Sequence, residues 1–114
     1  GAGASRCNCT ICTKVGATSV VAKPDALRLL SGAEDLAEYR RGSHPNSRAF
    51  CRRCGIQVFG RGFVEELGGA YVSVNVNCLD DVDPWELPVA YWDGRHDNWG
   101  AGPRKEPWPV LARG

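Results

Sequence analysis

The stretch SRAFCRRCGIQVFGRG, residues 47–62, predicts a strand, a tight turn and a second strand. Cys51 and Cys54 flank the two residues of the turn and Gly55 follows, which is the arrangement of a zinc knuckle. The turn brings two sulfurs within reach of one ion, and glycine adopts the backbone angles that such a turn requires. Apolar residues on either side would anchor the two arms in a core. The stretch therefore predicts a metal-stabilised β-hairpin.

The sequence on both sides of this hairpin continues the β pattern. In AYVSVNVNCL, residues 70–79, valines alternate with polar or aromatic residues, which is the two-residue period of a strand. The β-branched run at 17–23 predicts another strand, and weaker patterns predict strands at 37–41 and 89–92. Because 14 glycines and 7 prolines interrupt every longer pattern, we expect a mainly β fold of short antiparallel strands with little helix, in a single domain spanning 1–114.

The composition gives no sign of a nucleic-acid or membrane partner. The net charge is +1, and no apolar run approaches the roughly 20 residues of a membrane span. Residues 1–57 carry nine Lys or Arg against four Asp or Glu, together with five of the six cysteines. We interpret these cations as a balance for thiolates. No secretory signal pattern is visible, so we expect a cytoplasmic protein, in which clustered cysteines indicate metal binding or catalysis.

The stretch CNCTIC adds three cysteines and leaves two metal arrangements open. In the first, Cys9 and Cys12 join Cys51 and Cys54 in one closed structural site, and Cys7 is not used. In the second, Cys7, Cys9 and Cys12 hold a zinc ion of their own whose fourth position is open, as in a catalytic site. Disulfides within either group are disfavoured because the close spacing strains the bridge. Spacing alone does not decide between the two arrangements.

Alternatives to metal binding exist at the knuckle cysteines, at Cys78 and at His44. Cys51 and Cys54 have two alternatives to zinc binding, namely a pair of small buried apolar residues or a redox pair. We expect Cys78 to be buried on the valine face of its strand, with a role as a replacement zinc ligand as the alternative. His44 precedes a proline, and we expect it to lie in a solvated loop rather than on a metal.

The stretch DGRHDNW gathers polar side chains beside tryptophans. As the rim of a pocket, Arg95 would bind a substrate carboxylate and His96 would move a proton near pH 7. The alternative is a structural loop held in place by Trp92 and Trp99. The acidic run at 80–83 is expected to be a solvated turn rather than a catalytic carboxylate pair.

Together, CNCTIC, FCRRCG, VNVNCLDDVD and DGRHDNW resemble the glutathione-dependent formaldehyde-activating enzyme family, whose domain also occurs in centromere protein V. The resemblance covers about residues 7–109. It implies a β-tent fold, in which a few small antiparallel sheets pack around zinc, and Zn²⁺ as the cofactor. It also implies that Cys7, Cys9 and Cys12 hold the catalytic zinc. The late CxxC pair would belong to a second, structural zinc site.

In the family an earlier CxC completes that structural site, and this sequence has none upstream of Cys7. What else would bind an ion at Cys51 and Cys54 is therefore open. The implied activity is that of a carbon–sulfur lyase resembling S-(hydroxymethyl)glutathione synthase. Zinc would keep a thiol, glutathione or a similar one, ionised for reversible addition to formaldehyde or another small aldehyde. Arg95 and His96 would contact this substrate.

Two other functions remain open at this point. The first is a non-enzymatic β-tent module that uses zinc only for folding and binds a protein partner. The second is a zinc-ribbon nucleic-acid binder. The basic residues around the knuckle are few and no aromatic stripe is interleaved with them, which disfavours the nucleic-acid binder. The sequence makes no prediction of the oligomeric state.

Overall fold

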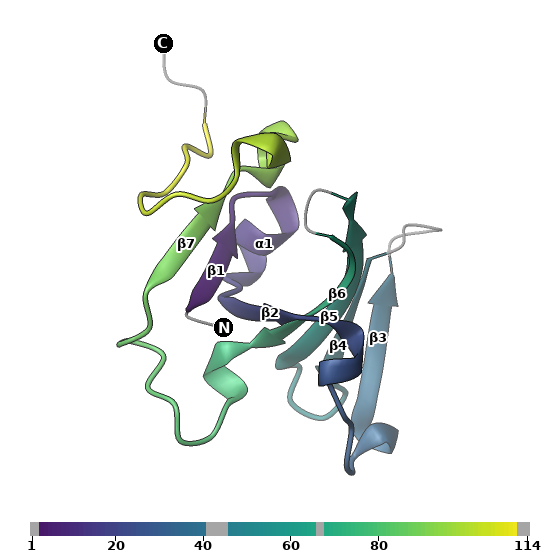
Figure 1. Ribbon diagram of the computed structural model, residues 1–114. Helices are drawn as coiled ribbons and strands as arrows, with labels where there is room; N and C mark the ends of the chain where they lie inside the picture. Colours follow the sequence, from purple (N-terminus) through teal and green to yellow (C-terminus); the bar gives the residue numbers. More distant parts are fainter. Residues whose placement is uncertain (1–2, 41–45, 66–67, 112–114) are drawn as a thin grey trace.

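The computed structural model describes residues 3–40, 46–65 and 68–111 of the chain (Figure 1). Its strands join into one seven-stranded sheet in the order β3-β4-β5-β6-β2-β1-β7. Neighbouring strands are antiparallel, except that β1 and β7 run parallel. The strands are β1 (Ala4–Cys7), β2 (Ser19–Ala22), β3 (Leu36–Arg40), β4 (Ser47–Cys51), β5 (Gln57–Val64), β6 (Gly69–Asn75) and β7 (Val89–Trp92).

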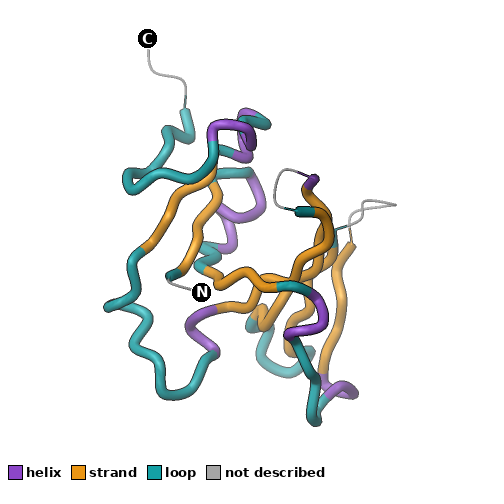
Figure 2. Tube along the Cα trace, in the orientation of Figure 1, coloured by secondary structure: helices purple, strands orange, loops and turns teal. Residues whose placement is uncertain are grey.

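Helical structure is short and lies in the segments between the strands and after the last one (Figure 2). The α-helix α1 (Thr10–Val15) directly follows β1. Five single 3₁₀ turns are seen as well among the described residues: η1 (Pro24–Ala26), η2 (Ala33–Asp35), η4 (Val76–Cys78), η5 (Gly94–His96) and η6 (Trp99–Ala101). Within the described residues, no helix has both the length and the apolar character that crossing a membrane requires.

The predicted mainly β fold with little helix is confirmed, and most of the predicted strands lie where the sequence placed them. The hairpin at 47–62 forms β4 and β5, and the strand predicted at 89–92 is β7. The resemblance implies a few small sheets, whereas backbone pairing joins the described strands in a single sheet. Arg41, the last residue of the strand predicted at 37–41, and His44 lie outside the described residues.

The strand predicted at 70–79 is shorter than its alternating pattern indicates. It ends at Asn75, whose side-chain oxygen accepts a hydrogen bond from the backbone N–H of Asn77 (3.0 Å) and caps the 3₁₀ turn η4. The turn carries Cys78 out of the sheet, so this cysteine is exposed. The prediction that Cys78 is buried with the valines is therefore wrong, because a local side-chain cap overrides the strand pattern.

The sheet bends around a hollow rather than lying flat. In Figure 1 the paired β1 and β7 stand apart from β3–β6, and β2 bridges the two groups. A cavity of about 550 Å³ lies between them, lined by residues from α1 and from strands on both sides. The core is small: Val72 and Val76 are fully buried, and Ala4, Ala49 and Phe59 are nearly so. The bend therefore leaves room for a pocket at the expense of core volume.

Candidate metal centre

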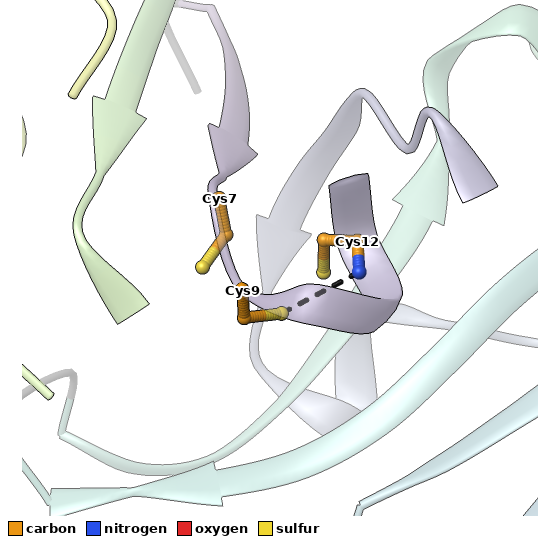
Figure 3. Close-up of side chains that lie close together, drawn as sticks. All are labelled: Cys7, Cys9 and Cys12. Carbon is orange, nitrogen blue, oxygen red and sulfur yellow. Dashed lines mark hydrogen bonds between the residues drawn. The ribbon is translucent and has the colours of Figure 1, made fainter. Parts of the chain in front are cut away.

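Three cysteines converge where β1 passes into α1 (Figure 3). Cys7 is the last residue of β1, Cys9 is the N-cap of α1, and Cys12 lies in the first turn of that helix. The Cys9 sulfur accepts a hydrogen bond from the backbone N–H of Cys12 (3.5 Å), which is how a side chain at the N-cap satisfies a free donor of the first turn. The CxCxxC motif therefore caps the helix and also places its three sulfurs close together.

The sulfur atoms of Cys7, Cys9 and Cys12, here called the cysteine triad, all lie within 4.8 Å of one another. Thiolates that share a tetrahedral zinc ion at Zn–S distances of about 2.3 Å are separated by about 3.8 Å. Small side-chain rotations would bring the triad to that separation. All three residues are half-buried and border the 550 Å³ cavity, so one side of the triad faces open space. The triad could thus hold a metal ion with a position left for another ligand.

The triad sulfurs also share protons. The pKa of Cys9 is lowered, because Cys12 and Cys7 donate hydrogen bonds to its sulfur. The pKa of Cys12 is raised, because its thiol donates to Cys7 and Cys9 and because it is buried. The pKa of Cys7 is raised too: its hydrogen bond with Cys12 lowers it, but the bond with Cys9 and burial outweigh that effect. Metal binding at such a group requires deprotonated sulfurs, so a bound cation would displace the thiol protons.

A buried hydrogen-bond network fixes the loop between Cys7 and Cys9. Asn8 is 9% exposed, and its amide nitrogen donates to Asp93 Oδ1 (2.7 Å) and to the Pro109 carbonyl (3.1 Å). The Asn8 side-chain oxygen accepts a hydrogen bond from the backbone N–H of Arg95 (2.9 Å). Residues more than 80 positions away in sequence therefore hold the triad loop against the segment that follows β7.

Asp93 is the centre of this network and is 5% exposed. Besides Asn8, it pairs with His96 Nδ1 (2.6 Å) and accepts a hydrogen bond from the Asn98 amide (3.4 Å). Burial alone would raise the pKa of Asp93, but the hydrogen bonds from Asn8, His96 and Asn98 outweigh it, and the pKa is lowered. Asp93 is therefore held as a carboxylate, and it orients a loop without lining the cavity.

Gly94 follows Asp93 and lies directly against the triad. A Cβ atom at this position would be 2.5 Å from the sulfur of Cys7 and 2.8 Å from ring carbons of Trp99. The Trp99 ring packs in turn against Trp92, with 5.9 Å between the ring centroids. Only glycine lets the tryptophan-packed loop approach the sulfur this closely.

The two predicted substrate-binding residues lie in different surroundings. Arg95 lines the cavity with the triad, although its Nε donates to the Asn8 carbonyl (2.8 Å) and so also helps to hold the loop. His96 is not among the residues that line that cavity, and its Nδ1 is occupied by Asp93. Both roles remain predictions.

Among the polar residues that line the cavity, two that the sequence did not single out interact electrostatically with the triad. The guanidinium of Arg48, from β4, donates to the sulfur of Cys12 (3.8 Å between Nη2 and Sγ). Tyr71, from β6, lines the same cavity, and its pKa is raised by burial and by the charge of Cys12. The phenol therefore remains protonated at neutral pH. Neither residue belongs to a recognisable motif, and both come from strands that are remote from the triad in sequence.

The CxxC stretch at Cys51 and Cys54, here called the knuckle, forms the predicted turn. Gly55 has a positive φ of 80°, and its N–H donates to the Cys51 carbonyl (2.7 Å). The pKa of Cys51 is lowered, because its sulfur accepts hydrogen bonds from the backbone of Cys54 and Arg53. Cys78 lies close enough that the charge of Cys54 adds to burial in raising its pKa. In the described part of the chain, however, the triad alone brings three candidate ligands within 4.8 Å of one another. The first arrangement, with Cys9 and Cys12 closed by the knuckle, is therefore not the one that the structure adopts.

The comparisons with known proteins agree with this geometry. A family model described as "Glutathione-dependent formaldehyde-activating enzyme" matches residues 2–95. A crystal structure of a Rhodobacter sphaeroides protein matches with 35% sequence identity and a TM-score of 0.63, over 77% of this chain and 81% of that chain. The family match includes the triad, the knuckle and the chain as far as Arg95.

Proposed function

The chain belongs to the glutathione-dependent formaldehyde-activating enzyme family, as its motifs indicated, and from this premise we propose that it is a zinc-dependent carbon–sulfur lyase. It would add a thiol, glutathione or a similar one, reversibly to formaldehyde or another small aldehyde. The observation that carries the proposal is the cysteine triad, whose sulfurs lie within 4.8 Å of one another at the wall of a cavity. Thiolate donors in this number suit zinc and leave room for a substrate sulfur.

Zinc, held by the triad, would supply the positive charge that keeps the sulfur of a substrate thiol ionised near neutral pH. In the proposed reaction, the thiol would give up its proton to solvent, and its sulfur would attack the aldehyde carbon and form the carbon–sulfur bond. The carbonyl π-electrons move to oxygen, which takes up one proton and becomes the hydroxyl of the S-hydroxymethyl product. The reverse reaction breaks the same carbon–sulfur bond and releases the aldehyde.

The residues of this chain would position the substrates and stabilise the negative charge that develops on the aldehyde oxygen. The phenol of Tyr71 is protonated at neutral pH and lines the cavity, so it is suited to donate a hydrogen bond to the aldehyde oxygen as negative charge develops there. Gly62 lies opposite Tyr71 in the register of β5 and β6 and leaves space for its hydroxyl. The network around Asn8 and Asp93 would keep the triad loop rigid during turnover.

The proposal is tested by measuring exchange between ¹³C-formaldehyde and S-hydroxymethylglutathione by NMR. We expect wild-type protein loaded with zinc to accelerate the exchange, and Cys7→Ser to abolish the acceleration. Cys78→Ser is the matched control because Cys78 is exposed and is not part of the triad. Thermal unfolding of the three proteins checks that the variants fold. A folded, zinc-loaded wild type that does not accelerate exchange with glutathione or other common thiols would contradict the proposal and favour a non-enzymatic binding module.

A further inference from the structure

Arg48 is placed so that its cation lies against the triad. It is half-buried in β4, between Ser47 (4% exposed) and Ala49 (6% exposed), so the backbone that carries it is held in the sheet. Its Nη2 donates to the sulfur of Cys12 at 3.8 Å, a contact between residues 36 positions apart in sequence. The same charge lowers the pKa of Cys9 and opposes the rise in the pKa of Tyr71.

Three other arginines line the cavity, namely Arg6, Arg61 and Arg95, and the last two are engaged by groups other than the triad sulfurs. The guanidinium of Arg61 lies over the ring of Phe59, 5.5 Å from its centroid. Arg95 donates through Nε to the backbone carbonyl of Asn8. In the described part of the chain, Arg48 is thus the arginine whose side chain bonds to a triad sulfur.

The contact between Arg48 and Cys12 affects which ligand the metal prefers, because candidate ligands differ in charge. Three thiolates and one divalent zinc ion carry a net charge of −1, and a fourth thiolate would raise it to −2. A neutral ligand such as imidazole would leave it at −1. A fixed cation beside the sulfurs favours the more negative complex, and a hydrogen bond to a ligand sulfur withdraws charge from the metal. Arg48 therefore acts on anionic ligands more strongly than on neutral ones.

We propose that Arg48 selects an anionic sulfur ligand for the fourth position of the triad site, by offsetting the negative charge that the bound thiolate adds. This inference rests on the proposed function, because it assumes that the triad holds a divalent metal with one exchangeable position. Arg48 contacts a metal ligand rather than the substrate, so its role is that of a positioning and charge-balancing residue. It makes the site selective for thiols over neutral nitrogen ligands of similar size.

The test uses cobalt(II) as the probe metal, because its visible spectrum reports sulfur ligands directly. Cobalt-loaded wild type, Arg48→Met, Arg48→Lys and Arg61→Met are titrated with 2-mercaptoethanol and, separately, with imidazole. We expect Arg48→Met to weaken thiol binding about 10- to 100-fold, the range for groups that bond to metal ligands, and to change imidazole binding far less. Arg48→Lys should restore much of the thiol affinity. Arg61→Met, which removes a cation from the same cavity, should shift it by less than about 3-fold.

The outcomes separate this inference from the proposed function. If Arg48→Met weakens thiol and imidazole binding equally, or weakens neither, the role of Arg48 is refuted while the triad site stands. Equal thiol losses in Arg48→Met and Arg61→Met would also refute it, because the effect would then be general to the cavity. A wild-type protein that binds cobalt without the charge-transfer bands of thiolate ligands, or whose cobalt accepts no thiol, would overturn both proposals.

Discussion

Replacing Asn8 by alanine should damage both the fold and the metal centre, because one side chain ties the triad loop to the segment after β7. The change removes the hydrogen bonds to the Pro109 carbonyl and from the backbone N–H of Arg95, each worth about 1 kcal/mol. It also removes the bond to the carboxylate of Asp93, and hydrogen bonds to charged groups are worth about 1.5–3 kcal/mol. The expected loss in the free energy of unfolding is therefore about 4 kcal/mol.

Such a loss is large for a chain of 114 residues, whose whole stability should be roughly 6–17 kcal/mol. Urea unfolding of the zinc-loaded protein measures it, and competition with a chromophoric chelator measures zinc affinity, which should fall about 10- to 100-fold. Asn77→Ala is the matched control: Asn77 is exposed and uses its backbone N–H to bond to Asn75, so the control should change stability by less than about 0.5 kcal/mol. A loss below about 1 kcal/mol for Asn8→Ala, with zinc affinity unchanged, would refute the reasoning.

Three further predictions follow from the packing and the charges. Gly94→Ala should reduce zinc affinity because its Cβ would lie 2.5 Å from the Cys7 sulfur, whereas Gly100→Ala, in open space, should leave the chelator titration unchanged. Val76→Ala should lower the free energy of unfolding in urea by about 2–3 kcal/mol because the side chain is fully buried. A clearly smaller loss would contradict the placement of Val76 in the core. Asp93 has a lowered folded pKa, so its contribution to stability is complete above its unfolded value of about 3.9 and is lost as the pH falls through the folded value. Urea unfolding from pH 6 to 2 should therefore show wild type and Asp93→Asn converging at the acid end, and parallel curves would disprove the assignment.

Local patterns predicted the strands and the knuckle well. The alternation along β6 and the hairpin of β4 and β5 depend on residues that are neighbours in sequence, and the structure has both. The alternation fails after Asn75, whose side chain accepts a hydrogen bond from the backbone N–H of Asn77 and caps the 3₁₀ turn that leaves Cys78 exposed. The N-terminal strand β1 was not predicted, because its four residues have no pattern and pair with β7, more than 80 residues away.

The candidate site was predictable as a set of cysteines but not as a pocket. The spacing in CNCTIC suffices to gather the three sulfurs, since a helix N-cap and its first turn do so locally. The partners of this loop come from parts of the chain that are distant in sequence. Arg48 reaches Cys12 from β4. Asp93 reaches Asn8 because β1 and β7 pair in parallel with Cys7 opposite Trp92. The sequence held one signal of this network, the amide side chain of Asn8 between Cys7 and Cys9. A polar side chain beside metal ligands is expected to have a hydrogen-bond partner.

The most direct test of the account is the number of sulfur atoms around the metal. Protein loaded with one equivalent of zinc should give an X-ray absorption spectrum with three sulfurs at about 2.3 Å and one oxygen or nitrogen at about 2.0 Å. Addition of glutathione should convert this to four sulfurs, because the substrate thiol takes the open position of the triad. Four sulfurs before any thiol is added, or three that remain after saturation with glutathione, would contradict the central claim that Cys7, Cys9 and Cys12 hold a zinc ion that is open to a thiol.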